Sequence, residues 1–153
     1  MTSNPAEEKI EPIRISATLA AGQNRRIIAK ARGHVIEMDV RKERGGDDAG
    51  PTPPECLAMA LGGCVMNLTR MIARDSGIRL EDVNMAISGD IDPSKAFGLD
   101  GNVRAGFLDL SIAMELIPGL SDGERERLQS EITRRCPLCD TISNPTPLRI
   151  SLK

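Results

Sequence analysis

The sequence predicts an α+β domain whose elements follow the order βββ-α-ββ-α-β, with mainly antiparallel strands. Several short segments alternate apolar and polar residues, which is typical of half-buried strands. One long segment repeats apolar residues at spacings of three and four, which is typical of a helix. The strands follow one another directly, which favours hairpins over crossover connections. We expect one domain over residues 13–153, behind a flexible, polar N-terminal tail at residues 1–12.

The N-terminal part predicts a meander of three strands. The first is indicated by apolar residues that alternate with polar ones, namely Ile13, Ile15, Ala17 and Leu19. Turn signals at residues 21–24 and at Gly33-His34 separate it from strands at 26–32 and 35–40. Residues 41–54 are rich in charge, glycine and proline and predict a loop.

A long helix is expected from about residue 55 to residue 76, after a proline cluster and before Gly77. Its apolar stripe consists of Leu57, Leu61, Cys64, Val65, Leu68 and Ile72. Glycine costs a helix about 1 kcal/mol relative to alanine. The pair Gly62-Gly63 therefore indicates that something packs closely against this turn.

The C-terminal half predicts two strands, a second helix and a final strand. Alternation marks strands at residues 83–91 and 108–116. Ser121 and Glu124 have the spacing of a capping box, which starts a helix. Its apolar residues Leu128, Ile132 and Cys136 lie four apart. The last strand is indicated by the alternating residues Leu148, Ile150 and Leu152.

Composition argues against several classes of partner. The net charge is −2 and the chain has no Trp or Tyr, so we expect no nucleic-acid partner. No apolar run approaches the about 20 residues of a membrane span, and the N-terminus does not resemble a signal peptide. We therefore expect a cytoplasmic protein without a membrane partner. Four cysteines in that compartment favour reduced thiols, a metal site or redox chemistry over structural disulfides.

Two of the cysteines are predicted to face the core. Cys64 lies in the apolar stripe of the long helix, and Cys136 ends the apolar face of the second helix. Pro137 suits the first position of a new helical segment, so Cys136 would be its N-cap. A helix N-terminus and the neighbouring Arg134 and Arg135 would lower the pKa of the Cys136 thiol.

These residues carry a family resemblance. The run Gly45-Gly46 with Gly50-Pro-Thr-Pro-Pro-Glu55, the motif Leu61-Gly-Gly-Cys64 and the motif Arg135-Cys136-Pro137 resemble the OsmC/Ohr superfamily. That superfamily includes osmotically induced proteins and organic hydroperoxide resistance proteins. The resemblance covers residues 13–153. It implies strands around a long buried central helix, and an intertwined homodimer.

The resemblance also implies thiol peroxidase chemistry. Cys64 matches the peroxidatic cysteine and Cys136 the resolving one, the substrate would be an organic hydroperoxide, and a lipoyl-type dithiol would be the external reductant. No cofactor or metal is implied. The family's arginine follows the first strand, and we assign it to Arg26 rather than Arg25. Its carboxylate partner would be Glu55. Because Glu55 stands nine residues before Cys64, about 13 Å along a helix, it would need an irregular first turn to reach the site.

The residues support this chemistry independently. Peroxide reduction needs a thiolate, and burial in an apolar pocket raises a thiol pKa. A nearby arginine would offset that cost, because it stays charged and its fork can hold both a thiolate and a carboxylate.

Several alternatives remain open from sequence alone. The protein could be a redox-sensing or small-molecule-binding member of the superfamily without efficient turnover. It could also be a structural dimer whose core thiols are inert. Cys136-Pro-Leu-Cys139 has the spacing of a CxxC motif, which would support thiol exchange or zinc binding. One such pair with a single histidine is a poor zinc set. Arg25 and Arg26 could be ordinary surface charges. Glu55 could be a carboxylate that interacts favourably with the dipole of its helix.

Overall fold

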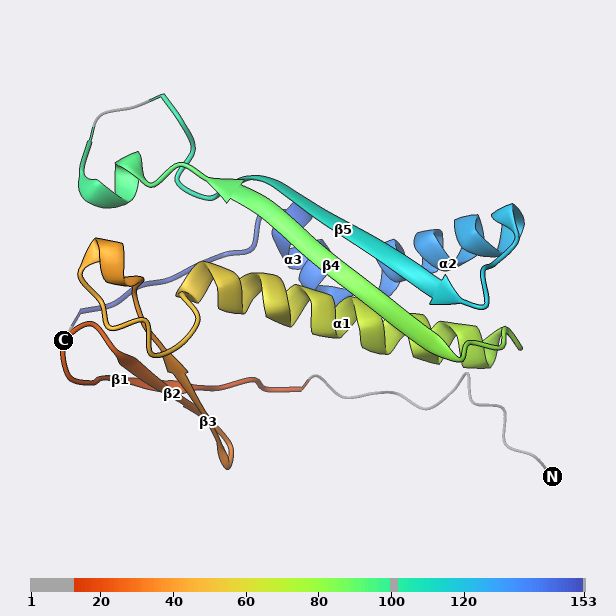
Figure 1. Ribbon diagram of the computed structural model, residues 1–153, viewed down its shortest axis with the longest axis horizontal. Helices are drawn as coiled ribbons and strands as arrows, with labels where there is room; N and C mark the ends of the chain where they lie inside the picture. Colours follow the sequence, from red (N-terminus) through yellow and green to blue (C-terminus); the bar gives the residue numbers. More distant parts are fainter. Residues whose placement is uncertain (1–12, 100–101, 153) are drawn as a thin grey trace. The chain divides into compact units, whose positions relative to one another are not determined.

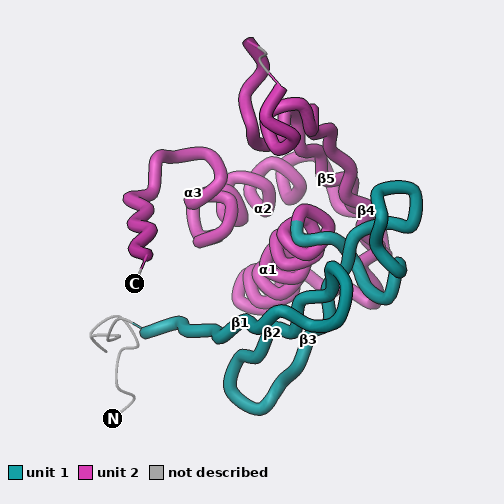
Figure 2. Tube along the Cα trace, turned by 90° about the vertical axis from the view of Figure 1, so that its left-hand side faces the viewer, with its two compact units in different colours: residues 1–53 teal, residues 54–153 magenta. Residues whose placement is uncertain are grey.

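The computed structural model describes residues 13–99 and 102–152, so the expected tail at residues 1–12 lies outside the described residues. The chain divides into two compact units, Met1–Pro53 and Pro54–Lys153, which Figure 2 distinguishes by colour. Each unit is described by itself below, with the labels of Figure 1.

The first unit contains a three-stranded antiparallel sheet in the order β1-β2-β3. Its strands are Thr18–Ala21, Ile27–Ala31 and His34–Met38. The predicted meander is therefore confirmed, but β1 begins later than the alternation from Ile13 suggested. Thr18 already pairs with Lys30, near the end of β2, and the chain then turns at Arg32, which has a φ of 54°. Only Ala31 of β2 lies beyond this pair, so residues before Ala17 have no β2 backbone left to pair with.

The second unit is built around one long helix, α1, which begins at the unit boundary and spans Pro53–Asp75. A hairpin of β4, Asp82–Ile91, and β5, Phe107–Ile117, follows it. The strands are antiparallel, with Met85 opposite Met114. Two further helices are α2, Asp122–Arg135, and α3, Pro137–Ser143. Two short 3-10 helices complete the elements of the described chain. They are Lys42–Arg44 in the first unit and Ser94–Phe97 in the second.

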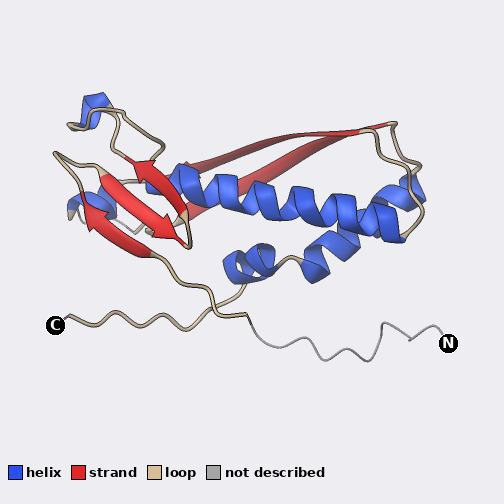
Figure 3. Cartoon of the chain, turned by 90° about the horizontal axis from the view of Figure 1, so that it is seen from below, coloured by secondary structure: helices blue, strands red, loops and turns tan. Residues whose placement is uncertain are grey.

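The core of the second unit forms where α1 packs against the hairpin and α2. Figure 3 shows α1 with the hairpin and the shorter helices on different sides of it. The buried cluster comprises Leu61, Val65, Leu68, Ile72, Leu128, Ile132 and Cys136, and the hairpin adds Met85, Leu110, Ile112, Met114 and Leu116. The predicted stripe is confirmed from Leu61 onward. Leu57 is 42% exposed, because the cluster begins one turn after it.

The glycine pair in α1 has one close neighbour, as expected, but only at its first member. A Cβ added to Gly62 would lie 2.5 Å from Cδ1 of Ile87 on β4. A Cβ added to Gly63 would meet no atom within 4 Å. Gly62 therefore allows the hairpin to approach α1 two residues before Cys64.

The predicted final strand is wrong for the described chain. Residues 145–152 have no regular structure, and Leu148, Ile150 and Leu152 are 82%, 82% and 95% exposed. A strand needs a neighbour to bond its backbone, and neither sheet of the described residues includes this segment. The observed order is βββ-α-ββ-α-α, which is still an α+β fold with antiparallel strands.

Length and composition alone would allow α1 to cross a membrane, contrary to the expectation that no such run exists. The core helix of a globular unit passes the same test. Here Leu61, Val65, Leu68 and Ile72 are buried in the cluster of the second unit, which favours a core role for the helix.

Candidate redox-active site

The second unit brings Cys64 and Cys136 together. Their Sγ atoms lie 3.3 Å apart, within hydrogen-bonding distance, and both are free thiols. A covalent S–S bond is about 2.05 Å long, so the sulfurs are only about 1.2 Å farther apart than in a disulfide. Cys136 is 1% exposed, whereas Cys64 is half-buried. The pair can therefore close into a disulfide after a small movement.

The local sequence explains why Cys136 is held there. Leu128, Ile132 and Cys136 recur every four residues, so they share one face of α2, and all three are buried in the cluster with α1. Pro137 then disfavours a helical conformation at Cys136, which adopts φ −81° and ψ 112° between α2 and α3. This break in the helix ends α2 just before Cys136, whose thiol contacts that of Cys64. The predicted N-cap role of Cys136 is confirmed.

The two thiols have opposite pKa shifts. Burial alone would raise the pKa of Cys136, but hydrogen bonds from the backbone N–H of Cys139 and from the Cys64 thiol outweigh it and lower that pKa. Burial raises the pKa of Cys64, and its hydrogen bond with Cys136 raises it further. The surroundings within this unit therefore favour a thiolate at Cys136 over a thiolate at Cys64.

Cys139 completes a cluster of three thiols. Its backbone N–H donates to Sγ of Cys136 at 3.4 Å. Burial, followed by the hydrogen bond and charge of Cys136, raises the pKa of the Cys139 thiol to about 11. Cys139 was not among the residues predicted to be catalytic, although the CxxC spacing indicates its proximity to Cys136. The fourth cysteine, Cys56, stands eight residues before Cys64 on α1, about 12 Å away along the axis.

The first unit holds Arg26 between two carboxylates. Its Nη1 donates to Oε1 of Glu37 at 3.2 Å and its Nη2 to Oδ2 of Asp47 at 3.3 Å. Its Nε is buried without a hydrogen-bond partner. The neighbouring Arg25 is exposed. Arg26 is thus the arginine that has a defined position. Neither Glu37 nor Asp47 was expected from the sequence as a partner of Arg26.

A buried carboxylate fixes the loop that carries Asp47. Asp39 is 1% exposed and accepts N–H bonds from Val40 at 2.7 Å and from Asp47 and Ala49 at 3.0 Å each. The N–H of Ala49 makes the largest contribution to lowering the Asp39 pKa, and the other two N–H groups and Arg26 add to it against burial. The loop therefore presents Asp47 to Arg26 in a fixed position.

Glu55 lies in the first turn of α1, which is regular helix from Pro53. Nine residues of continuous helix separate it from Cys64, so the two lie about half a turn out of phase and about 13 Å apart along the axis. The irregular turn that would bring Glu55 to the thiol is not observed. Catalytic roles for Arg26 and Glu55 stay predictions.

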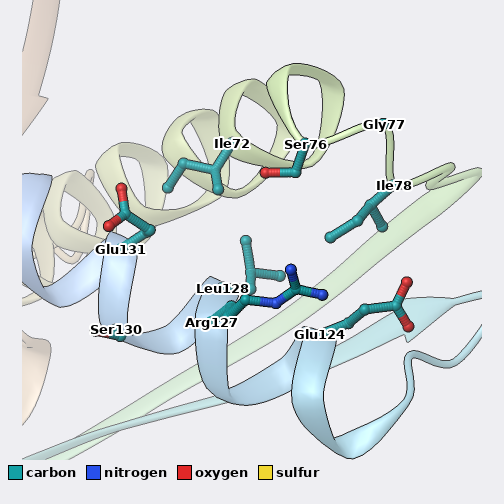
Figure 4. A pocket seen from close by; sticks show the side chains of 9 residues that line it. All are labelled: Ile72, Ser76, Gly77, Ile78, Glu124, Arg127, Leu128, Ser130 and Glu131. Carbon is teal, nitrogen blue, oxygen red and sulfur yellow. The ribbon is translucent and has the colours of Figure 1, made fainter.

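Over residues 13–99 and 102–152, no group of three or more His, Cys, Asp or Glu side chains could hold a metal ion. A cavity of about 300 Å³ lies where the end of α1 faces α2, lined among others by Ile72, Ile78, Arg127 and Leu128 (Figure 4). None of the cysteines lines this cavity.

A match to a protein-family model shows the family to which the chain belongs. The model of the family described as "OsmC-like protein" matches residues 45–151. The chain belongs to the OsmC-like family. The match includes all four cysteines of this OsmC-like chain, so the thiol cluster lies inside the family domain. No curated protein matches the sequence closely enough to count as a relative.

Solved structures share the fold of this OsmC-like chain at low sequence identity. An OsmC-like protein from Mycoplasma pneumoniae is 17% identical, with a TM-score of 0.74 and coverage of 87% of this chain and 89% of the other. An organic hydroperoxide resistance protein OsmC from Legionella pneumophila is 21% identical, with a TM-score of 0.63 and coverage of 87% and 91%. The organic hydroperoxide resistance protein OhrB of Bacillus subtilis is 14% identical, with a TM-score of 0.55 and coverage of 83% and 88%.

Proposed function

We propose that this protein is a cytoplasmic, thiol-dependent peroxidase that reduces organic hydroperoxides through a sulfenic acid at Cys64, which Cys136 resolves. The observation that carries the proposal is the 3.3 Å separation of the two Sγ atoms, one at the centre of α1 and the other between α2 and α3. Membership of the OsmC-like family supports it, because structural neighbours are named organic hydroperoxide resistance proteins.

The exposure of the two thiols favours Cys64 as the attacking sulfur. Cys136 has the lower pKa but is 1% exposed, so a hydroperoxide reaches it poorly. Cys64 is half-buried and hydrogen-bonded to Cys136. As the Cys64 sulfur attacks, its proton passes to the Cys136 thiolate. Cys136 thus serves as the base for Cys64. Because the two thiols interact, their apparent pKa values belong to the pair and not to either residue alone.

The reaction balances with the two thiols, the hydroperoxide and water. The Cys64 sulfur attacks one peroxide oxygen, the O–O bond breaks, and the alkoxide leaves and takes a proton from water as the alcohol. Cys64 is left as sulfenic acid. The Cys136 sulfur then attacks the Cys64 sulfur, and the hydroxide that leaves takes the Cys136 proton as water. The enzyme is left with a Cys64–Cys136 disulfide, which an external dithiol of the lipoyl type reduces.

Two further parts of the proposal come from the family resemblance. Arg26 would lower the pKa of Cys64 in the assembled protein, with Glu37 and Asp47 holding its guanidinium. The active form would be a homodimer. The exposed alternating residues of the C-terminal segment support this, because a second copy could supply the strand partner that they do not find among the described residues of their own chain.

The test is consumption of cumene hydroperoxide with dihydrolipoamide as reductant. We expect turnover in the wild type, none in Cys64→Ser, and sulfenic or over-oxidised Cys64 in Cys136→Ser. Cys56→Ser is the matched control, since it removes a half-buried thiol of the same helix without touching the pair. Turnover of Cys64→Ser at the wild-type rate would refute the proposal. Oxidation without turnover would favour a redox sensor, the second candidate.

A further inference from the structure

We propose that Cys139 is a second resolving cysteine, which attacks the Cys64–Cys136 disulfide and moves the bond to Cys136–Cys139. This inference rests on the proposed function. It gives a role to a thiol that the two-cysteine scheme does not use. The product is an oxidised CxxC pair with Cys64 free again as a thiol.

The geometry places Cys136 between two potential sulfur partners. Its Sγ lies 3.3 Å from Sγ of Cys64, and it accepts the Cys139 N–H at 3.4 Å. Cys136 is the N-cap of α3 and Cys139 its third helical residue, the position whose backbone N–H an N-cap side chain accepts. The Cys139 side chain is partly buried and packs against the core cluster that contains Cys136. Cys139 therefore stands beside the sulfur it must attack.

The chemistry needs no further reactant. The Cys139 thiolate attacks Sγ of Cys136, the Cys136–Cys139 bond forms, and the Cys64–Cys136 bond breaks with the electron pair leaving on Cys64. The proton lost by Cys139 is balanced by the proton that the Cys64 thiolate takes up. No net oxidation or reduction accompanies the exchange.

The electrostatics put the steps in order. In the reduced cluster, burial and then the neighbouring Cys136 hold the pKa of Cys139 at about 11, so Cys139 stays protonated. Once Cys136 is bonded to Cys64, it is no longer a thiolate and its charge no longer opposes ionisation of Cys139. Cys139 therefore becomes a better nucleophile only after the first disulfide has formed.

The test counts hydroperoxide consumed without any reductant. Reduced wild-type protein receives two successive equivalents of cumene hydroperoxide, with dimedone present only during the second. We expect the wild type to consume both, because the exchange frees Cys64 to react again and form a dimedone adduct. Cys139→Ser should consume one and stop as the Cys64–Cys136 disulfide. Cys56→Ser should behave as the wild type.

Peptide mapping after an acid quench follows the bonds directly. Trypsin releases Cys136 and Cys139 together in residues 136–149, and Cys64 with Cys56 in residues 45–70. We expect the cross-link between these peptides to appear first. It should then give way to a peptide 136–149 that has lost two hydrogens. In Cys64→Ser this internal bond should not form, which separates the exchange from direct oxidation of the CxxC pair.

The outcomes distinguish the two proposals. A wild type that stops after one equivalent with a persistent Cys64–Cys136 bond would overturn the exchange and leave the peroxidase intact. Equal consumption by the wild type and Cys139→Ser would do the same. A wild type that forms no Cys64–Cys136 bond at any time would instead overturn the proposed function. The wild-type time course stands even if a variant fails to fold.

Discussion

The close approach of β4 to α1 at Gly62 can be tested by adding one methyl group. Gly62→Ala places a Cβ 2.5 Å from Cδ1 of Ile87, whereas ordinary carbon contacts are about 3.5–4.0 Å. Alanine favours the helix by about 1 kcal/mol. Overpacking a filled core costs about 1–3 kcal/mol. We expect a net loss of stability of up to about 2 kcal/mol, or up to about 8 °C in Tm.

A second substitution removes the atom responsible. Ile87→Val deletes Cδ1 and should cost about 0.5–1.5 kcal/mol by itself. In the double variant the added Cβ no longer meets Cδ1, so the helix gain offsets the loss at residue 87. We expect a stability near that of the wild type, and a favourable coupling of about 1–3 kcal/mol between the two sites.

The assay is urea unfolding of the wild type, both single variants and the double variant, followed by circular dichroism at one protein concentration. If the two single effects add to within about 0.5 kcal/mol, the contact between Gly62 and Ile87 is not the reason for the glycine. A stabilised Gly62→Ala variant would refute the reasoning at once.

Three further predictions concern the arginine, the assembly and the buried aspartate. Arg26→Ala should raise the pKa of Cys64 and slow its alkylation near neutral pH more than Arg25→Ala does, and equal rates in both variants would remove this region from the mechanism. Light scattering at micromolar concentration should give the mass of a dimer, and a folded monomer would contradict the proposed assembly. Asp39 has a lowered pKa in the folded chain, so below about pH 3.9 the unfolded chain binds more protons. Its contribution to stability is therefore present above that pH and lost as the pH falls further, and Asp39→Asn should flatten this part of the acid dependence of the urea midpoint.

Much of the fold followed from periodicity. The spacing in α1 predicted Leu61, Val65, Leu68 and Ile72 as its buried face, because a helix that packs on one side must repeat apolar residues in that way. The alternation around Leu148 led to the wrong prediction of a final strand, for a related reason. Alternation records which residues could share a sheet face, but a strand forms only where a neighbouring backbone is available.

The candidate site was predictable only in part. Cys64 lies within the apolar stripe of one helix and Cys136 at the end of the apolar face of another. These positions predicted that both thiols would face the core, and their sulfurs do lie together. The partners of Arg26 were not predictable, because Glu37 comes from a strand and Asp47 from a loop fixed by Asp39. Such long-range pairings leave no periodic signal in the sequence.

Proteolysis of the exposed C-terminal segment also measures assembly of the protein without any label. Arg149 lies between Leu148 and Ile150, in a stretch without regular structure, so trypsin can cut there readily in a chain by itself. A neighbouring strand that bonded this backbone would protect the same peptide bond. The rate of cleavage after Arg149, followed as a function of protein concentration, therefore reports how much of the segment is covered at any moment.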